Sequence, residues 1–190
     1  MNILFFSTLL IFIILIINYF NSARKKSRLR LLTIFGILIG IITLGLNFLS
    51  NSCFGASTPI DVKTENLTKQ NLKIYGITFW EDFGDGNGNY THYDKELKPN
   101  ETSEFCIDND GGKFWLVAKN EKNEITYIKE SLSNESNFEY KITNQNVEIE
   151  KAKIAKELTL KTDKSIELEK YLIWTNIILI GLLAISLLKK

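Results

Sequence analysis

Three long apolar blocks, at residues 3–20, 29–49 and 171–188, dominate the pattern of hydrophobic and polar positions along this chain. No charged residue lies at the centre of any block, and every Asp and Glu lies between the second block and the third. A bilayer core about 30 Å thick is crossed by roughly 20 apolar residues of helix at about 1.5 Å each. The pattern therefore predicts three transmembrane helices, at residues 1–20, 29–49 and 171–188, and one polar domain at residues 50–170.

The polar domain alternates apolar and polar positions from residue 60 onward, with Gly, Asn and Asp between the runs. A period of two is typical of antiparallel strands with one buried face. The expected fold class is a membrane-anchored α+β protein, in which a small antiparallel β-sandwich is inserted between the second and third helices. Its candidate strands lie at residues 60–64, 72–80, 91–93, 102–107, 113–119, 125–130, 138–142 and 147–149.

Two stretches of the domain depart from this simple alternation. The candidate strand at 113–119 is apolar on both of its faces, which predicts a central position in a sheet. Residues 148–170 fit either a strand or a short helix, followed by a linker. From about residue 165 a helix is expected to continue into the third transmembrane segment.

The loop between the first two apolar blocks, residues 21–30, is densely basic. Short basic loops stay in the cytoplasm, which places the domain on the outer side of the cell's inner membrane. The lysines at 156–170 favour the opposite orientation, but long translocated segments follow the charge rule weakly. A cleaved signal peptide fits residues 1–20 poorly, because no cation precedes the apolar run. The residues that set this topology are Arg24, Lys25, Lys26, Arg28 and Arg30.

The formal net charge of +1 conceals a segregation of charge. Seven of the 23 Lys and Arg residues lie in the basic loop and at the C-terminus, which leaves 16 cations against 22 acidic residues in the domain. A domain with this acidic excess is unsuited to a phosphate backbone, so nucleic acid is excluded as a partner. The expected partners are the lipid bilayer and a protein of unknown identity.

Cys53 and Cys106 are the only cysteines, and both lie in the segment placed outside. A disulfide between them is the expected pairing, because structural disulfides persist in oxidising compartments. Closing a loop of about 50 residues stabilises a domain by roughly 4 kcal/mol in the chain-entropy treatment. Two alternatives stay open, namely lipid attachment at Cys53 and two free thiols. Two thiols and His92 do not complete a tetrahedral ligand set, so neither a metal site nor a cofactor is expected.

Residues 85–96 place oxygen-bearing side chains at the spacing of an EF-hand calcium loop. Tyr90 departs from that pattern, because it stands where a Gly permits the sharp turn. A flexible Asn- and Gly-rich loop is the simpler interpretation. The candidate calcium ligands are Asp85, Asn87, Asn89 and Glu96.

Two further groups are candidate contact sites. Phe83, Tyr90 and Tyr93 lie in or beside the same loop with few apolar neighbours, and exposed aromatic side chains commonly anchor interfaces. Gly36 and Gly40 form a GxxxG pair in the second apolar block. This spacing permits close approach of another helix, from the same chain or from a partner.

The chain carries no nucleophile elbow and no phosphate-binding loop. Its acidic loop positions are interpreted as solvated residues rather than a glycosidase pair; they are Glu81, Asp82, Asp108 and Asp110. We therefore expect a non-enzymatic integral membrane protein with an extracytoplasmic β-rich binding or scaffold domain. The alternatives are a small accessory subunit of a membrane complex and an immunity-like or stress-related membrane factor.

The disulfide hypothesis predicts a redox-dependent gel mobility. Full-length protein isolated with alkylated thiols is expected to migrate faster without reductant than with it, because the cross-linked chain stays more compact. A Cys53→Ser variant is the control and is expected to show no such difference. Equal mobility of the wild-type protein in both conditions would count against the pairing.

Overall fold

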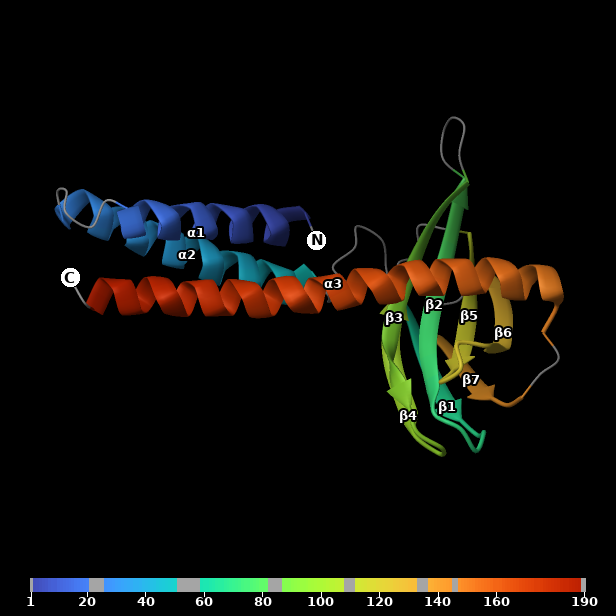
Figure 1. Ribbon diagram of the computed structural model, residues 1–190. Helices are drawn as coiled ribbons and strands as arrows, with labels where there is room; N and C mark the ends of the chain where they lie inside the picture. The colour runs from blue at the N-terminus through green and yellow to red at the C-terminus, as the bar shows by residue number, and fades with distance from the viewer. Residues whose placement is uncertain are drawn as a thin grey trace. The chain divides into compact units, whose positions relative to one another are not determined.

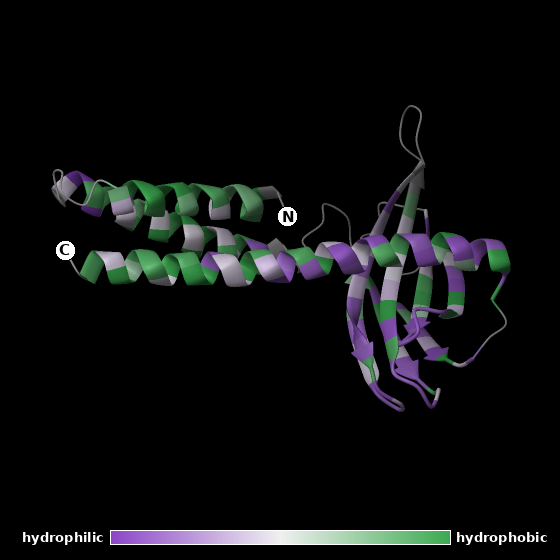
Figure 2. Cartoon of the chain, viewed as in Figure 1, coloured by the Kyte–Doolittle hydropathy of each residue, from purple (hydrophilic) through white to green (hydrophobic). Residues whose placement is uncertain are grey.

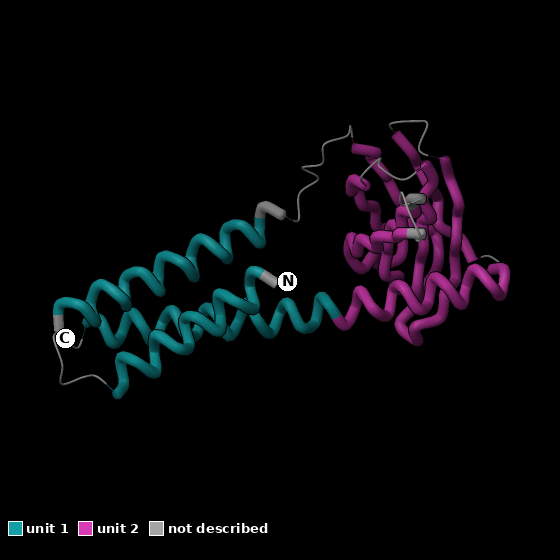
Figure 3. The backbone as a smooth tube through the Cα atoms, turned by 90° about the horizontal axis from the view of Figure 1, so that it is seen from above, with its two compact units in different colours: residues 1–52, 165–190 teal, residues 53–164 magenta. Residues whose placement is uncertain are grey.

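The computed structural model describes residues 2–20, 26–50, 59–81, 87–107, 112–132, 137–144 and 147–188. The chain divides into two compact units, shown in separate colours in Figure 3. The helical unit comprises residues 1–52 and 165–190, and the β-domain comprises residues 53–164. One helix contributes residues to both units.

The helical unit contains α1 (Asn2–Phe20), α2 (Lys26–Ser50) and the last part of α3 (Ile149–Leu188). Figure 2 shows apolar residues over most of these helical segments. All three helices are long and apolar enough to cross a membrane, which agrees with the three predicted segments. A helix suits that environment because its backbone donors and acceptors are satisfied within the segment.

The three helices pack closely beside two glycines of α2. A β-carbon added to Gly36 would lie 3.0 Å from Ile14 of α1 and 3.0 Å from Leu183 of α3. At Gly40 the corresponding distance to Ile180 is 2.6 Å. The GxxxG pair therefore serves contacts within this chain.

Polar side chains add hydrogen bonds between the same helices. Asn18 Nδ2 donates to Thr33 Oγ1 over 2.8 Å and so joins α1 to α2. Asn176 of α3 is fully buried, and its Nδ2 donates to Ser7 Oγ at 3.2 Å and to Thr8 Oγ1 at 3.3 Å. In an apolar medium such bonds stabilise helix pairs by about 1 kcal/mol each.

The β-domain contains two sheets, in which most neighbouring strands pair antiparallel (Figure 1). One sheet has the strand order β4-β1-β7 and the other has the order β3-β2-β5-β6. The β1–β7 pair is parallel. The strands are β1 (Ile60–Asn66), β2 (Leu72–Glu81), β3 (Asn87–Leu97), β4 (Thr102–Ile107), β5 (Lys113–Asn120), β6 (Ile125–Leu132) and β7 (Asn137–Ile142).

The core between the sheets follows from the alternation seen in the sequence. Along β1, Ile60 and Val62 are buried while Asp61 and Lys63 are exposed. The inward side chains of both sheets meet in one apolar cluster, in which Phe114 packs edge-on against Phe138 at a centroid distance of 5.1 Å. These contacts confirm a sandwich of two packed sheets.

The segment after β7 differs from the prediction. The strand expected at 147–149 is wrong, and so is the linker before residue 165, because α3 runs without interruption from Ile149. The segment from 149 to 170 holds many Ala, Leu, Lys and Glu residues and no Gly or Pro, a composition that favours helix. In addition, Ala155 and Leu158 pack against an apolar sheet face.

The residues beside the helical glycines give a testable difference. Gly40→Leu is expected to destabilise the helical unit by about 1–3 kcal/mol, because the new side chain collides with Ile180 and Ile11. Gly45 has open space beside it, so Gly45→Leu is the matched control and is expected to have little effect. The measurement is the SDS concentration that unfolds the full chain from mild detergent. Equal midpoints for the two variants would contradict this packing.

Candidate binding surface of the β-domain

The two sheets of the β-domain differ in what covers their outer faces. Residues 149–164 of α3 lie across the outer face of β3-β2-β5-β6, where Ala155 and Leu158 pack on Tyr75, Ile77 and Val117. The outer face of β4-β1-β7 carries exposed charged side chains instead. We call this second surface the open face. Its outward residues on the three strands include Asp61, Lys63, Glu65, Glu104, Glu139 and Lys141.

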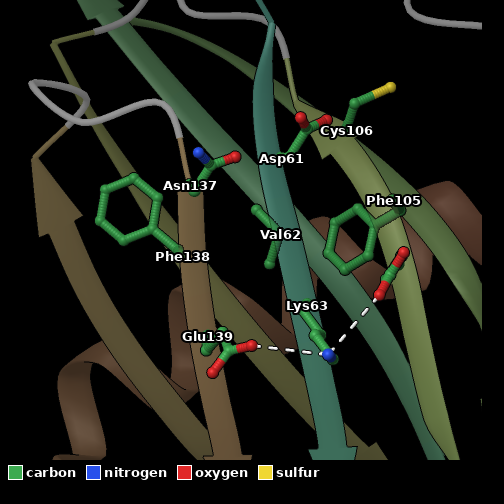
Figure 4. Close-up of a pocket in the computed structure, with 9 residues that line it drawn as sticks. Asp61, Val62, Lys63, Phe105, Cys106, Asn137, Phe138 and Glu139 are labelled. Carbon is green, nitrogen blue, oxygen red and sulfur yellow. Dashed lines mark ion pairs between the residues drawn. The ribbon is translucent and has the colours of Figure 1, made fainter.

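A depression of about 590 Å³ lies on the open face (Figure 4). Register places Lys63 of β1 between Glu104 of β4 and Glu139 of β7. The Lys63 Nζ atom lies 3.7 Å from Glu104 Oε1 and 3.5 Å from Glu139 Oε1. Such exposed pairs contribute little to stability, about 0–1 kcal/mol, so these groups stay available to a ligand. The lining residues are Asp61, Val62, Lys63, Glu104, Phe105, Cys106, Asn137, Phe138 and Glu139.

The open face has an acidic excess. Lys63 is shared by two carboxylates, so that group of three keeps a negative charge. Asp61 and Glu65 extend the negative charge along β1, and Lys141 is the other cation among these outward residues. A surface of this kind favours cationic partners through long-range attraction that salt screens.

The covered face holds a buried charge. Lys119 of β5 is fully buried, and its ammonium group forms a salt bridge with Asp163 of α3. The Tyr75 hydroxyl donates to the same carboxylate over 2.6 Å, and the Lys119 Nζ atom lies 4.9 Å from the centre of the Tyr75 ring. Burial, together with the hydrogen bond and charge of Asp163, raises the pKa of Tyr75 far above its usual range. We call Tyr75, Lys119 and Asp163 the lysine anchor.

A second set of contacts holds the first turn of α3. Lys151 Nζ lies 3.4 Å from Glu130 Oε2 of β6 and 5.9 Å from the centre of the Trp115 ring. Trp115 Nε1 donates to the same Glu130 oxygen over 3.0 Å. Lys151 and Asp163 are separated by about 18 Å of helix, so this part of α3 is fixed at both ends.

Four polar or aromatic side chains connect β3 to β4. Ser103 Oγ donates to the Asp94 carboxylate, and the His92 ring stacks on Phe105 at a centroid distance of 5.8 Å. Burial raises the pKa of Asp94, and the hydrogen bond from Ser103 opposes that shift. Burial also lowers the pKa of His92. These contacts join the two sheets, because β3 and β4 belong to different ones.

The predicted calcium loop does not form in the described part of the chain. Asn87, Asn89 and Glu96 all lie on the extended strand β3. Asn89 and Glu96 are separated by about 23 Å of strand, too far to share one ion. Asp85 lies outside the described residues. Across the described ranges, no group of three or more His, Cys, Asp or Glu side chains could hold a metal ion.

The predicted aromatic interface is divided by the fold. Tyr90 of β3 is 56% exposed. Tyr93 instead packs on Tyr75 at a centroid distance of 5.3 Å, as part of the apolar cluster beneath α3. Phe83 lies outside the described residues, as do Asp82, Asp108 and Asp110 of the acidic loop positions; Glu81 ends β2.

Cys106 is disulfide-bonded. Cys53 lies outside the described residues, so the Cys53–Cys106 pairing stays a prediction. Of the basic loop, Lys26 begins α2, and Arg28 and Arg30 are exposed in its first turns. Arg24 and Lys25 lie outside the described residues.

Sequence reasoning missed two features of the β-domain, namely the open face and the lysine anchor. The open face can be recognised only after the strand order is known, because Lys63, Glu104 and Glu139 are far apart in the sequence. The sequence contains one indication of the lysine anchor. Lys119 lies two residues after Val117 and four after Trp115, so it belongs to the same strand face, which is predicted to be apolar.

Comparison with known proteins gives no assignment. No protein-family model matches the chain, and no curated protein sequence matches it significantly. The function must therefore be argued from the surface itself.

The lysine anchor predicts a large asymmetry between variants. Asp163→Asn is expected to destabilise the β-domain by about 3 kcal/mol, because Lys119 then stays buried without a counter-charge. The double variant Lys119→Met/Asp163→Leu removes both charges and is expected to be more stable than Asp163→Asn, because only the Tyr75 hydroxyl then loses its partner. Glu157→Gln, on the exposed side of α3, is the control. Thermal unfolding followed by near-UV circular dichroism measures these differences, and a double variant less stable than Asp163→Asn would refute this role.

His92 predicts a pH dependence of stability. Its folded pKa lies below the ordinary value of about 6.5, so the unfolded chain binds the proton first as pH falls. The contribution of His92 to the free energy of unfolding is therefore fully present above about pH 6.5. Below that pH it declines, by up to about 1.4 kcal/mol per pH unit. His92→Phe keeps an aromatic ring on Phe105 and removes the titration. Unfolding free energies of both proteins from pH 5 to 8 are expected to diverge only below about pH 6.5, and a pH-independent difference would contradict the assignment.

Proposed function

We propose that this chain is an integral membrane protein whose β-domain binds or scaffolds another protein on the outer side of the inner membrane. The observation that carries the proposal is the difference between the two outer sheet faces. One face is covered by α3, whereas the other presents exposed charges around a depression of about 590 Å³. Exposed polar positions on a rigid sheet provide a preorganised surface for a partner.

Two observations support the outer side. The loop at 21–30 is the densest basic segment of the chain, and such loops stay in the cytoplasm. Cys106 is disulfide-bonded, a state typical of oxidising compartments. Both support our proposal that the β-domain lies in the periplasm or at the cell exterior.

We propose a binding role rather than catalysis because the groups with displaced pKa values take part in contacts that hold the fold together. Asp94 and His92 have displaced pKa values, and both lie in contacts that join β3 to β4. Tyr75 has a raised pKa as part of the lysine anchor. Each shift thus has a structural cause, although perturbed groups often mark catalytic sites.

An accessory subunit of a membrane complex is the second candidate. Gly45 of α2 and Gly181 of α3 are exposed, with no other group close to the position of an added β-carbon. Small residues on exposed helix faces permit a partner helix to approach closely. In that case the helices would bind the complex and the β-domain would cover an outer part of it.

Proximity labelling from the β-domain in intact cells tests the proposed function. We expect the labelled neighbours to be extracytoplasmic, and Glu104→Lys/Glu139→Lys to remove them by reversing charge on the open face. Glu96→Lys/Glu121→Lys is the matched control, since it makes the same charge change at exposed positions elsewhere. Labelling of cytoplasmic proteins, or equal loss in both variants, would contradict the proposal. If Gly45→Leu loses the labelled neighbours while the open-face variant keeps them, the result would favour the accessory subunit.

A further inference from the structure

We propose that the open face of one copy binds the exposed lysine side of α3 of a second copy. The inference rests on the proposed function, because it names the partner of the same surface. It follows from opposite charges on opposite faces of the β-domain.

The cationic surface lies on α3. Lys153, Lys156, Lys161 and Lys164 are exposed, on the side of the helix away from Ala155. We call these residues the lysine ridge. Within the part of the chain that the structure describes, none of the four has an ion-pair partner, in contrast to Lys151. The ridge is therefore a row of uncompensated cations with one carboxylate, Glu157, among them.

The open face offers the complementary charge over a matching span. From Lys153 to Lys164 the helix rises about 16 Å. From Asp61 to Glu65 the strand extends about 13 Å, and the two strand spacings from β4 to β7 add about 10 Å across it. A helix lying diagonally over the face thus spans roughly 16 Å of acidic surface, the same length as the ridge.

The layer order determines the kind of assembly. The β4-β1-β7 sheet and α3 lie on opposite sides of the β3-β2-β5-β6 sheet. One copy can therefore use its open face and its ridge at the same time, with two different neighbours. Such contacts are heterologous and generate rows or rings rather than a closed pair. Anchoring in one membrane raises the local concentration of copies and so favours weak charge contacts.

Charge reversal on the full chain tests the inference. Protein in phosphatidylcholine vesicles at low salt is treated with a carbodiimide, which joins a lysine to a carboxylate in contact. We expect cross-linked dimers and larger species in the wild type. Ridge reversal (Lys153→Glu, Lys156→Glu, Lys164→Glu) and face reversal (Asp61→Lys, Glu104→Lys, Glu139→Lys) are each expected to lower the yield by about tenfold or more, through like-charge repulsion.

Two combinations of the charge-reversed variants distinguish this contact from other causes of a lowered cross-linking yield. A chain with both reversals again presents opposite charges and is expected to recover the wild-type yield within about twofold. In a mixture of the two reversed chains, the intact face of one chain meets the intact ridge of the other, and the reversed face meets the reversed ridge. Both contacts join opposite charges, so the mixture is expected to restore cross-linked dimers and larger species that neither chain forms alone. Near-UV circular dichroism verifies that each variant is folded, and the mixture stays informative if the doubly reversed chain does not fold.

Wild-type protein that stays monomeric, single reversals that leave the yield unchanged, or a mixture that gives no dimer would each overturn the inference. If these results occur while the open-face variant still loses its extracytoplasmic neighbours in cells, the proposed function stands and only self-association fails. If the chain with both reversals recovers the cross-linking yield but the labelled neighbours are cytoplasmic, self-association stands and the proposed location fails.

Discussion

The β3-β2-β5-β6 sheet must be covered on both faces, and the rest of the β-domain depends on this constraint. Strand β5 places Leu116 on one face and Trp115 and Val117 on the other, all of them buried. Leaving either face in water would forfeit about 1.5–3 kcal/mol for each large side chain. The β4-β1-β7 sheet covers one face and α3 covers the other, so the β-domain has three layers.

The same requirement gives α3 two roles along its length. Residues 149–164 belong to the β-domain, and residues 165–188 belong to the helical unit. The lysine anchor fixes the register of the first part, because Asp163 must meet both Lys119 and Tyr75. A buried ion pair is a weak source of net stability but a strong penalty against misplacement. We interpret the anchor as a device that specifies how the helix lies on the sheet.

Much of the fold could be predicted from sequence because the patterns were long. Three long apolar blocks and most of the strands follow from the hydrophobic period of the sequence. Strand β3 proved longer than predicted, since Asn87–Leu97 pairs with β2 along its length although its composition suggested a loop. The start of α3 was missed because Leu158 and Leu160 alternate as in a strand, whereas the contact with Tyr75 and Val117 selects the helix.

The candidate surface was harder to predict, because it depends on pairing between distant strands. Lys63, Glu104 and Glu139 become neighbours only through the β4-β1-β7 order. Tyr93 shows the converse, since an aromatic residue with polar sequence neighbours became part of a core through Tyr75.

Hydrogen exchange of the full chain in lipid nanodiscs tests the three-layer account most directly. If α3 is the third layer, backbone amides at 153–163 are expected to exchange as slowly as those of β2 and β5, because they open only when the domain unfolds. Exchange of that segment as fast as in the exposed turn at 121–124, while β2 and β5 stay protected, would show that the helix does not cover the sheet and would contradict the account.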